Sequence, residues 1–351
     1  MDRYIGMDVH QASCTVAVIG PSGKRLKNHV VDTDATVLVE LMKGIAGDKH
    51  LCMEEGELSQ WLYEVLRPHV KELVVTQMRD RVGNKNDALD AWMLADMLRR
   101  QAVPMQVFKT TQYSRPLRDA VTGYEMVTRD MVRAKNRLRA VFRSNGVHVD
   151  EHIYDPEERK KKLKLLPPSK AQLGTELGQL LDATMASRDR LESWLHDRVK
   201  ESIEVRRLQT VPGLGSIRAA QVVAIVVSPE RFRTKRQFWS YCGLGIVHRS
   251  TNDWERGPQG RWKRTETTQA RGLNRNRNPR LKQVFRSAAK TVVDQMPNHP
   301  LYKDYERMLE AGTKPNLAQL TLARRIAAAT LAIWKHKENY DPAKHRRKDA
   351  A

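Results

Sequence analysis

The fold of this chain is decided near its start, by the stretch Tyr4-Ile5-Gly6-Met7-Asp8-Val9. Apolar residues alternate there with small or charged ones, which is the two-residue period of a β-strand. A carboxylate inside such a strand costs free energy unless it is exposed or bound to a cation. Asp8 is therefore the first residue to which the sequence assigns chemistry.

Outward from this strand, the sequence predicts two more strands and then an alternation of helices and strands. Thr15–Ile19 and Lys27–Asp32 have strand composition, and the turn residues Gly20-Pro21-Ser22-Gly23 separate them. Later segments follow as helices over 35–46, Leu58–Arg67 and Asp87–Arg100, and as strands over Lys49–Glu54 and Glu72–Thr76. This order of elements is that of a ribonuclease H-like α/β domain, which we expect over residues 1–107.

Charge is distributed unevenly along the 351 residues, whose formal net charge is +21. Residues 1–107 have 13 Lys and Arg against 15 Asp and Glu, whereas the rest of the chain has 49 against 26. A basic surface of this size indicates a polyanionic partner, most simply nucleic acid. The alternative is a ribosomal or merely solubilising basic surface, which composition does not exclude.

The three cysteines are Cys14, Cys52 and Cys242, and they form no Cys-x-x-Cys pair. This spacing argues against a zinc site and a disulfide framework and fits a reducing cytosol. No apolar run approaches the ~20 residues of a membrane span, and the N-terminus has a strand pattern in place of a signal peptide. We expect a cytoplasmic protein without a membrane partner.

The region after residue 107 is predicted to be all-α for the most part, in two domains. Over 108–205, apolar residues recur at helical spacings in two long stretches, which predicts an antiparallel helical pair. This pair is either a coiled-coil dimerisation arm or a plain hairpin within one subunit. Over 206–351, Val211-Pro212-Gly213-Leu214-Gly215 before a helix resembles a helix-hairpin-helix, whose backbone N–H groups at Gly213 and Gly215 would hold a phosphate. The alternative is an ordinary Pro-Gly turn.

Four acids are expected to meet in the first domain: Asp8, Glu54, Asp87 and Asp90. In a ribonuclease H-like sheet the first and fourth strands are neighbours, and the last helix packs across them. Clustered carboxylates repel one another unless cations hold them, and such oxygen ligands select Mg²⁺ or Mn²⁺. Two ions about 4 Å apart would stabilise both the attacking and the leaving oxygen of a phosphate. The alternatives are a helix cap for Asp87, a solvated acid for Asp90, and Glu55 in place of Glu54.

A basic stretch in the last domain is the candidate nucleic-acid surface. Trp254 and Trp262 are interleaved with its cations, and tryptophan stacks on unpaired bases. Burial in the core is the alternative for each tryptophan. The candidate contacts in and before this stretch are Arg249, Arg261, Lys263, Arg264, Arg271 and Asn274.

Five segments together resemble the insertion sequence one-hundred-and-ten family of DEDD transposases, relatives of the Piv-type DNA invertases. They are Tyr4-Ile5-Gly6-Met7-Asp8, Cys52-Met53-Glu54, Asn84-Lys85-Asn86-Asp87-Ala88-Leu89-Asp90-Ala91, Thr210-Val211-Pro212-Gly213-Leu214-Gly215 and Phe238-Trp239-Ser240-Tyr241-Cys242-Gly243-Leu244. The resemblance runs from residue 4 to about residue 290. It implies a RuvC-like fold for the first domain and a bacterial, nucleoid-associated enzyme that transposes an insertion sequence.

The resemblance also implies a catalytic serine shortly after Gly243-Leu244, and Ser250 is the serine at that point, with Thr251 as the alternative register. It implies strand exchange through a serine-phosphate link, with DNA as substrate, a guide RNA, and a homodimer or homotetramer in which one subunit supplies the acids and another the serine. A serine needs activation to act as a nucleophile; His248, Arg249 or a metal ion would supply it. The alternatives are a metal-dependent junction nuclease that uses water, and a non-catalytic nucleic-acid-binding protein.

Overall fold

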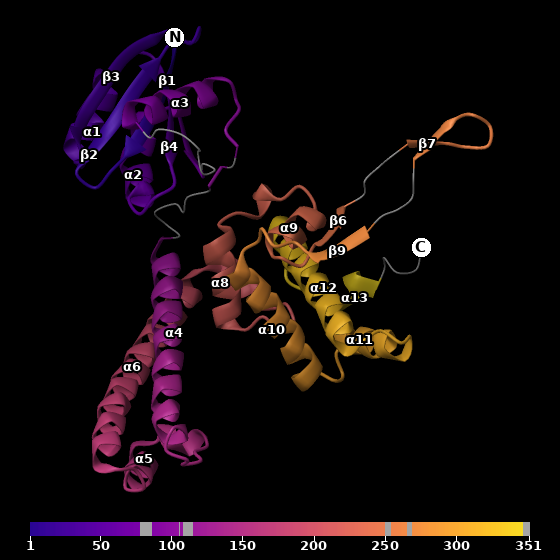
Figure 1. The fold of residues 1–351 in the computed structure, drawn as a ribbon. Coiled ribbons are helices and arrows are strands. Elements are labelled where there is room, and N and C mark those ends of the chain that lie inside the picture. The colour runs from indigo at the N-terminus through magenta and orange to yellow at the C-terminus, as the bar shows by residue number, and fades with distance from the viewer. Residues whose placement is uncertain (78–85, 105, 108–114, 250–253, 265–268, 347–351) are drawn as a thin grey trace. The chain divides into compact units, whose positions relative to one another are not determined.

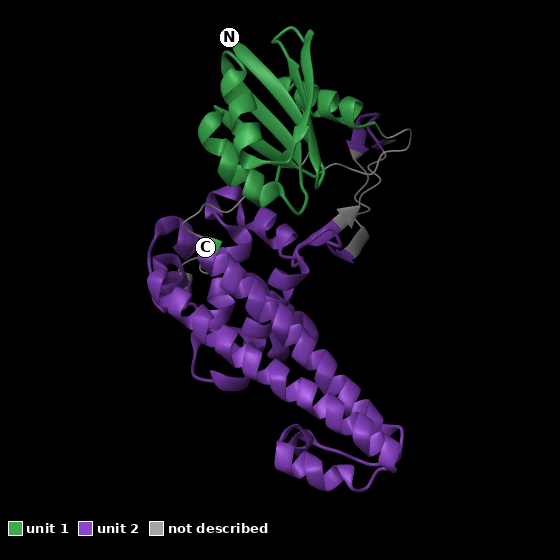
Figure 2. Cartoon of the chain, turned by 90° about the vertical axis from the view of Figure 1, so that its left-hand side faces the viewer, with its two compact units in different colours: residues 1–115 green, residues 116–351 purple. Residues whose placement is uncertain are grey.

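The computed structural model describes residues 1–77, 86–104, 106–107, 115–249, 254–264 and 269–346 (Figure 1). The chain divides into two compact units, Met1–Arg115 and Pro116–Ala351 (Figure 2). Each unit buries its own apolar residues in separate clusters. The predicted three-domain division stays a prediction.

The first unit is built on a five-stranded mixed sheet. Its spatial order is β3-β2-β1-β4-β5, in which β1, β2 and β3 are antiparallel and β4 and β5 run parallel to β1. The order of strands and helices expected from the sequence is confirmed. The strands are β1 (Asp2–Val9), β2 (Ser13–Ile19), β3 (Arg25–Asp32), β4 (Asp48–Glu54) and β5 (Glu72–Thr76), and the helices are α1 (Ala35–Gly44), α2 (Ser59–Leu66), the 3-10 turn η1 (Arg67–His69) and α3 (Asp87–Arg99).

The two faces of this sheet are covered by different helices. Because side chains alternate along a strand, Ile5 and Met7 of β1 point to one face, where they are fully buried with residues of α1 and α2. Gly6 lies on the other face, under α3. A Cβ atom at Gly6 would come within 1.9 Å of the carbonyl oxygen of Ala91 in α3. The absence of a side chain at Gly6 therefore sets how closely α3 approaches β1.

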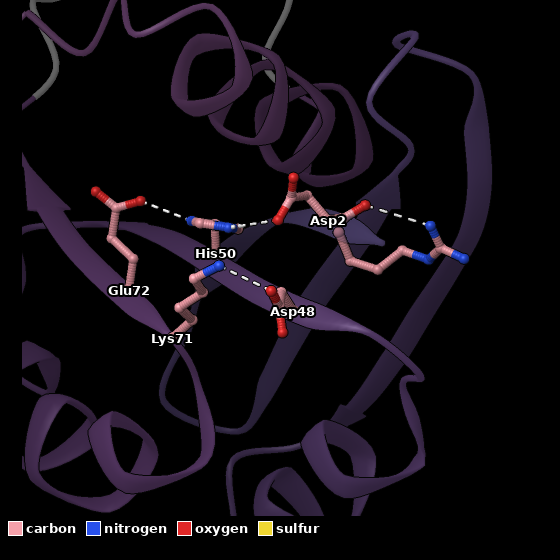
Figure 3. A network of polar contacts seen from close by, with 6 residues as sticks. Asp2, Asp48, His50, Lys71 and Glu72 are labelled. Atoms are coloured by element: carbon pink, nitrogen blue, oxygen red, sulfur yellow. Dashed lines mark hydrogen bonds and ion pairs between the residues drawn. The ribbon is translucent and has the colours of Figure 1, made fainter.

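At the amino end of the parallel strands, charged side chains are paired with one another (Figure 3). His50 Nδ1 lies 2.7 Å from a carboxylate oxygen of Glu72, and His50 Nε2 lies 3.3 Å from one of Asp2. Lys71 Nζ donates to Asp48 Oδ2 at 2.7 Å, and this bond holds the pKa of Asp48 below its usual value. Asp2, Asp48 and Glu72 at this edge of the sheet thus each have a side-chain partner within the protein.

The second unit begins with the predicted helical pair, α4 (Arg115–Arg143) and α6 (Pro168–Glu201). The connection between them contains η2 (Glu151–Tyr154) and α5 (Pro156–Leu163). Leu138 and Phe142 of α4 are buried in one cluster with Leu181 of α6, so the two helices pack within a single chain. The helical pair is confirmed, and its role in dimerisation stays a prediction.

The amino-terminal end of α4 and the carboxyl-terminal end of α6 pack into the core formed by the remaining helices. Leu117 and Leu195 are buried in the same cluster as Phe238 and Phe285, whose rings meet edge to face at 5.7 Å. The elements are α7 (Ile203–Leu208), α8 (Ser216–Val226), η3 (Pro229–Arg231), α9 (Lys235–Tyr241), α10 (Pro279–Gln295), α11 (Pro300–Glu310), α12 (Pro315–His336) and α13 (Pro342–Arg346), with the two-stranded sheets β6 (Ile246–Arg249) with β9 (Gln269–Leu273) and β7 (Trp254–Arg256) with β8 (Trp262–Arg264). Within the described ranges, no helix combines the length and apolar composition that a membrane span requires.

Candidate active site

Two of the predicted acids end neighbouring parallel strands. Met7 of β1 pairs with Met53 of β4, so Asp8 and Glu54 each follow one step later in the same register. Asp8 shares the parity of Gly6, and Glu54 shares that of Cys52, which is buried against α3. Both acids therefore belong to the face of the sheet that α3 covers.

The other two acids lie in the first turn of α3. Asn86 caps this helix, because its side chain accepts a hydrogen bond from the N–H of Ala88 at 3.0 Å. Asp87 is thus not the capping residue, and its carboxylate is available for other contacts. Asp87 and Asp90 are three residues apart, which places them on one side of the helix.

His10 joins the first strand to the last helix. Its Nε2 atom lies 3.2 Å from Asp8 Oδ2 and 3.4 Å from Asp87 Oδ2. His10 was not among the site residues predicted from the sequence. Its position two residues after Asp8 was the available signal, since residues i and i+2 of an extended segment share a face.

The electrostatics of Asp8 differ from those of an ordinary surface acid. Its side chain is only 16% exposed, and burial raises its pKa above the usual value. His10 lowers that pKa, whereas the charges of Asp87 and Asp90 raise it. These like charges act on one partly buried carboxylate, so a cation placed among them would stabilise its charged form.

The arrangement of donor atoms fits a divalent cation. One ligand atom from each of Asp8, His10 and Asp87 lies within 4.8 Å of the others. In the described part of the chain this group does not include Asp90 or Glu54, which lie on the same face of the sheet and helix. Carboxylate oxygens suit hard cations such as Mg²⁺ and Mn²⁺, and His10 adds a nitrogen donor.

The structure gives Glu54 and its neighbour Glu55 different surroundings. Ser59 Oγ at the start of α2 donates a hydrogen bond to Glu55 Oε2 at 3.2 Å. The backbone N–H of Glu55 donates to the carbonyl of Thr76 on β5. Glu55 is therefore bound to the start of α2, whereas Glu54 has the strand parity of the Asp8 face.

The expected phosphate-binding turn combines one buried and one exposed glycine. Gly213 is buried with φ of 78°, and a Cβ atom there would meet the carbonyl oxygen of Ala288 in α10 at 2.3 Å. This close approach gives Gly213 a packing role. Gly215 is exposed at the start of α8, where no side chain caps the helix.

Most of the remaining predicted nucleic-acid residues belong to the short strands of the second unit. Ser250 and Thr251 lie outside the described residues. Arg261 and Lys263 are exposed, and Arg249, Arg264 and Arg271 lie on strands β6, β8 and β9.

Asn274 differs from these residues because its side-chain amide is used inside the protein. It donates to Ser240 Oγ and to the carbonyl of Asn276, both at 2.8 Å, and it accepts a bond from the N–H of Asn276 at 3.0 Å. These bonds give Asn274 a role in holding its loop.

Both tryptophans of the basic stretch are exposed. Trp254 and Trp262 have 59% and 60% of their surface accessible. Burial in the core, the alternative weighed for each of them, is therefore wrong.

Two family models match the chain. A model of DEDD transposases, described as "Transposase", matches residues 5–145. A second, described as "Transposase IS116/IS110/IS902 family", matches residues 205–306. The first match contains all four predicted acids, and the second contains Ser250 and the basic stretch.

Two curated proteins are similar to parts of the chain. A "Probable family 20 transposase" of Pseudomonas aeruginosa is 28% identical over 189 residues, which is 50% of this chain and 53% of that protein. The "Transposase for insertion sequence element IS1328" of Yersinia enterocolitica is 24% identical over 169 residues, or 46% of this chain and 49% of that protein. The chain thus spans about half the length of the curated relatives that it matches.

Proposed function

Because this chain belongs to the IS110 family of insertion-sequence transposases, we propose that it cuts and rejoins DNA through a metal-assisted serine mechanism. The first unit would then be a ribonuclease H-like (RuvC-like) DEDD domain. The observation that supports this proposal best is the meeting of Asp8, His10 and Asp87 at the end of β1. Asp90 acts on the same carboxylate through its charge.

In this proposal the acids of the first unit hold a divalent cation, Mg²⁺ or Mn²⁺. The bound cation would supply Lewis-acid stabilisation of the charge that develops on a phosphate oxygen. Asp8 and Asp87 would be ligands, Glu54 and Asp90 would complete the carboxylate shell, and the partial burial of Asp8 would strengthen its attraction to the ion. Close packing of α3 on Gly6 holds the start of the helix, and thus Asp87 and Asp90, near β1.

Ser250 is the proposed nucleophile. Its Oγ forms an ester bond to a DNA phosphate as the P–O ester bond from that phosphate to one strand breaks. The serine proton passes to a basic group, and the leaving oxygen of that strand takes up a proton and becomes a hydroxyl. A hydroxyl of the partner strand then displaces the serine and restores a phosphodiester. The support for this assignment is its place in the matched segment 205–306.

A guide RNA and a homodimer or homotetramer belong to the same proposal. An RNA would supply sequence specificity through base pairing. The net charge of +21 fits a chain that binds polyanions such as RNA and DNA. An oligomer would let acids and serine from different subunits meet on one DNA substrate.

The experiment that tests the mechanism is trapping of a covalent protein–DNA adduct. Wild-type protein is incubated with Mg²⁺, RNA transcribed from the element and DNA containing the ends of the element, and adducts are resolved on a denaturing gel. Ser250→Ala should abolish both the adduct and strand cutting, whereas the matched control Thr251→Ala should keep them. Cutting that persists in Ser250→Ala would instead identify a nuclease that uses water.

A further inference from the structure

The second unit contains a small hairpin with an unusual composition, residues 254–264, which we name the tryptophan hairpin. Its strands pair Trp254 with Arg264 and Arg256 with Trp262. Directly opposed residues share a face of the ladder, and so do residues i and i+2 of each strand. Two tryptophan and two arginine positions therefore occupy one face, and the pair of Glu255 with Lys263 occupies the other.

The tryptophans of this face are presented to solvent. Trp254 and Trp262 are 59% and 60% exposed, which is unusual for the largest apolar side chain. The guanidinium carbon of Arg256 lies 5.4 Å from the centroid of the Trp262 ring, so a cation–π contact holds that ring across the strands. Exposed aromatic rings beside cations are the combination that binds bases and phosphates together.

Two backbone hydrogen bonds close the turn of the tryptophan hairpin. Gly260 N–H donates to the carbonyl of Gly257, and Gly257 N–H donates to the carbonyl of Arg261, both at 2.9 Å. Pro258 follows Gly257 in this turn, and Gly260 has φ of 69°, a conformation that glycine adopts without strain. These hydrogen bonds close the turn at one strand register, which puts both tryptophans on one face.

Charge identifies the kind of partner that fits this face. Residues 254–264 contain four Arg and Lys against one acid, and Arg256, Arg261 and Lys263 are exposed. A polyanion is therefore favoured over an apolar protein surface. In duplex DNA the faces of the bases are covered by their neighbours, so an aromatic ring stacks more readily on an unpaired base.

We propose that the tryptophan hairpin binds unpaired DNA, with Trp254 and Trp262 stacked on bases and the adjacent cations on phosphates. The proposal deepens the proposed function and rests on it, since DNA is the substrate expected of a transposase. Strand exchange must expose unpaired bases at the cut site, and Trp254 is only four residues from Ser250 in the sequence. The hairpin would hold such bases apart from the duplex.

The test compares binding of single-stranded and duplex DNA by the full chain. Fluorescence anisotropy with a labelled thymidine oligonucleotide, in the presence of EDTA, measures affinity without metal-dependent cutting. The double variant W254A/W262A should bind the single strand at least about tenfold more weakly, because stacking on each base is lost, while duplex binding should change less than about twofold because phosphate contacts remain. Trp194→Ala is the matched control, since Trp194 on α6 is also exposed, at 39%, and should leave both affinities unchanged.

A second pair of variants distinguishes the loss of aromatic stacking from the loss of the hairpin's fold. W254F/W262F keeps aromatic rings and should keep single-strand binding, whereas W254L/W262L keeps apolar bulk and should lose it. Unchanged single-strand affinity in W254A/W262A and W254L/W262L would overturn the proposal, as would equal losses for single strand and duplex. A larger loss on a uridine oligoribonucleotide than on the thymidine strand would overturn the assignment to DNA. Because the assay needs neither Ser250 nor the acids, its failure is distinguishable from failure of the proposed function.

Discussion

The two ends of strand β1 both place aspartate beside histidine, but the surroundings of the acids differ. Beside the amino end, Asp48 of the neighbouring strand β4 accepts a hydrogen bond from Lys71, which lowers the pKa of Asp48. At the carboxyl end, burial and the charges of Asp87 and Asp90 raise the pKa of Asp8. The first arrangement is complete within the protein, whereas the second would be stabilised by an added cation. Perturbed acids of this kind are typical of functional sites.

The largest expected difference between the two ends is in catalysis. Asp8→Asn should slow strand cutting by about a thousandfold, because the site loses a charged metal ligand and with it several kcal/mol of transition-state stabilisation. Asp48→Asn is the same change at the amino end, and its rate of strand cutting should stay within about twofold of wild type. Asp48 is not one of the proposed metal ligands, and its exposed ion pair with Lys71 contributes little to stability. Cleavage of DNA containing the element ends in Mg²⁺ measures both. Comparable losses of cutting rate in the two variants would show that the two ends of the strand do not differ in their importance for catalysis.

The next largest effect is on stability, and it concerns the packing of α3 against strand β1. Gly6→Ala introduces a methyl group where the Ala91 carbonyl lies 1.9 Å from the ideal Cβ position, so α3 must move. We expect a loss of roughly 2 kcal/mol or more in the free energy of unfolding, typical of overpacking, together with weaker cation binding.

Urea denaturation of the full chain tests this prediction, with Gly44→Ala in α1 as the matched control. A Cβ atom at Gly44 would meet nothing within 4 Å, and alanine is favoured over glycine in a helix. If Gly6→Ala is as stable as Gly44→Ala, α3 does not lie on β1 as described.

A smaller effect follows from the raised pKa of Asp8. A folded-state pKa above the unfolded value means that the charged carboxylate destabilises the fold, fully so above the folded pKa. Without divalent cations, Asp8→Asn should therefore raise the thermal midpoint at pH 7. The gain should vanish as the pH falls through the raised pKa toward 3.8, the ordinary value, because wild-type Asp8 then takes up a proton. Calorimetry in EDTA across this range measures the gain, and a lower midpoint for the variant at pH 7 would contradict it.

The smallest effect is expected at the amino end, and its sign is opposite. The lowered pKa of Asp48 means that its charged form stabilises the fold above the ordinary value of 3.8, and that this contribution is lost as the pH falls through the folded-state pKa. Asp48→Asn should slightly lower the thermal midpoint at pH 7, and the difference should fade in acid. The same calorimetric series detects it. A midpoint that rises in Asp48→Asn as in Asp8→Asn would show that the two ends do not differ electrostatically.

The sequence predicted the order of elements in the first unit because each strand and helix has a local apolar period. It also predicted that Asp8 and Glu54 end neighbouring strands, since the first and fourth strands are adjacent in the ribonuclease H-like layout that the order of elements indicated. The contact of His10 with both Asp8 and Asp87 joins two elements distant in the chain. The spacing of His10 from Asp8 alone does not reveal the second partner.

The second unit was less predictable for physical reasons. The sequence around a tryptophan does not reveal whether its side chain is buried or exposed. The exposure of Trp254 and Trp262 therefore depended on tertiary structure. The Pro-Gly turn at residues 211–215 likewise gave no sign that Gly213 would lie against α10. Long-range contacts of this kind depend on which surfaces meet, and local patterns do not encode that.

The most direct test of the account is Mn²⁺ binding by the full chain, followed by electron paramagnetic resonance of the free ion. Wild-type protein should bind Mn²⁺, Asp8→Asn should lose at least about tenfold in affinity through the missing carboxylate ligand, and Asp48→Asn should bind as wild type does. Equal Mn²⁺ affinity in wild type and Asp8→Asn would contradict the claim that the carboxyl end of β1 is a metal centre.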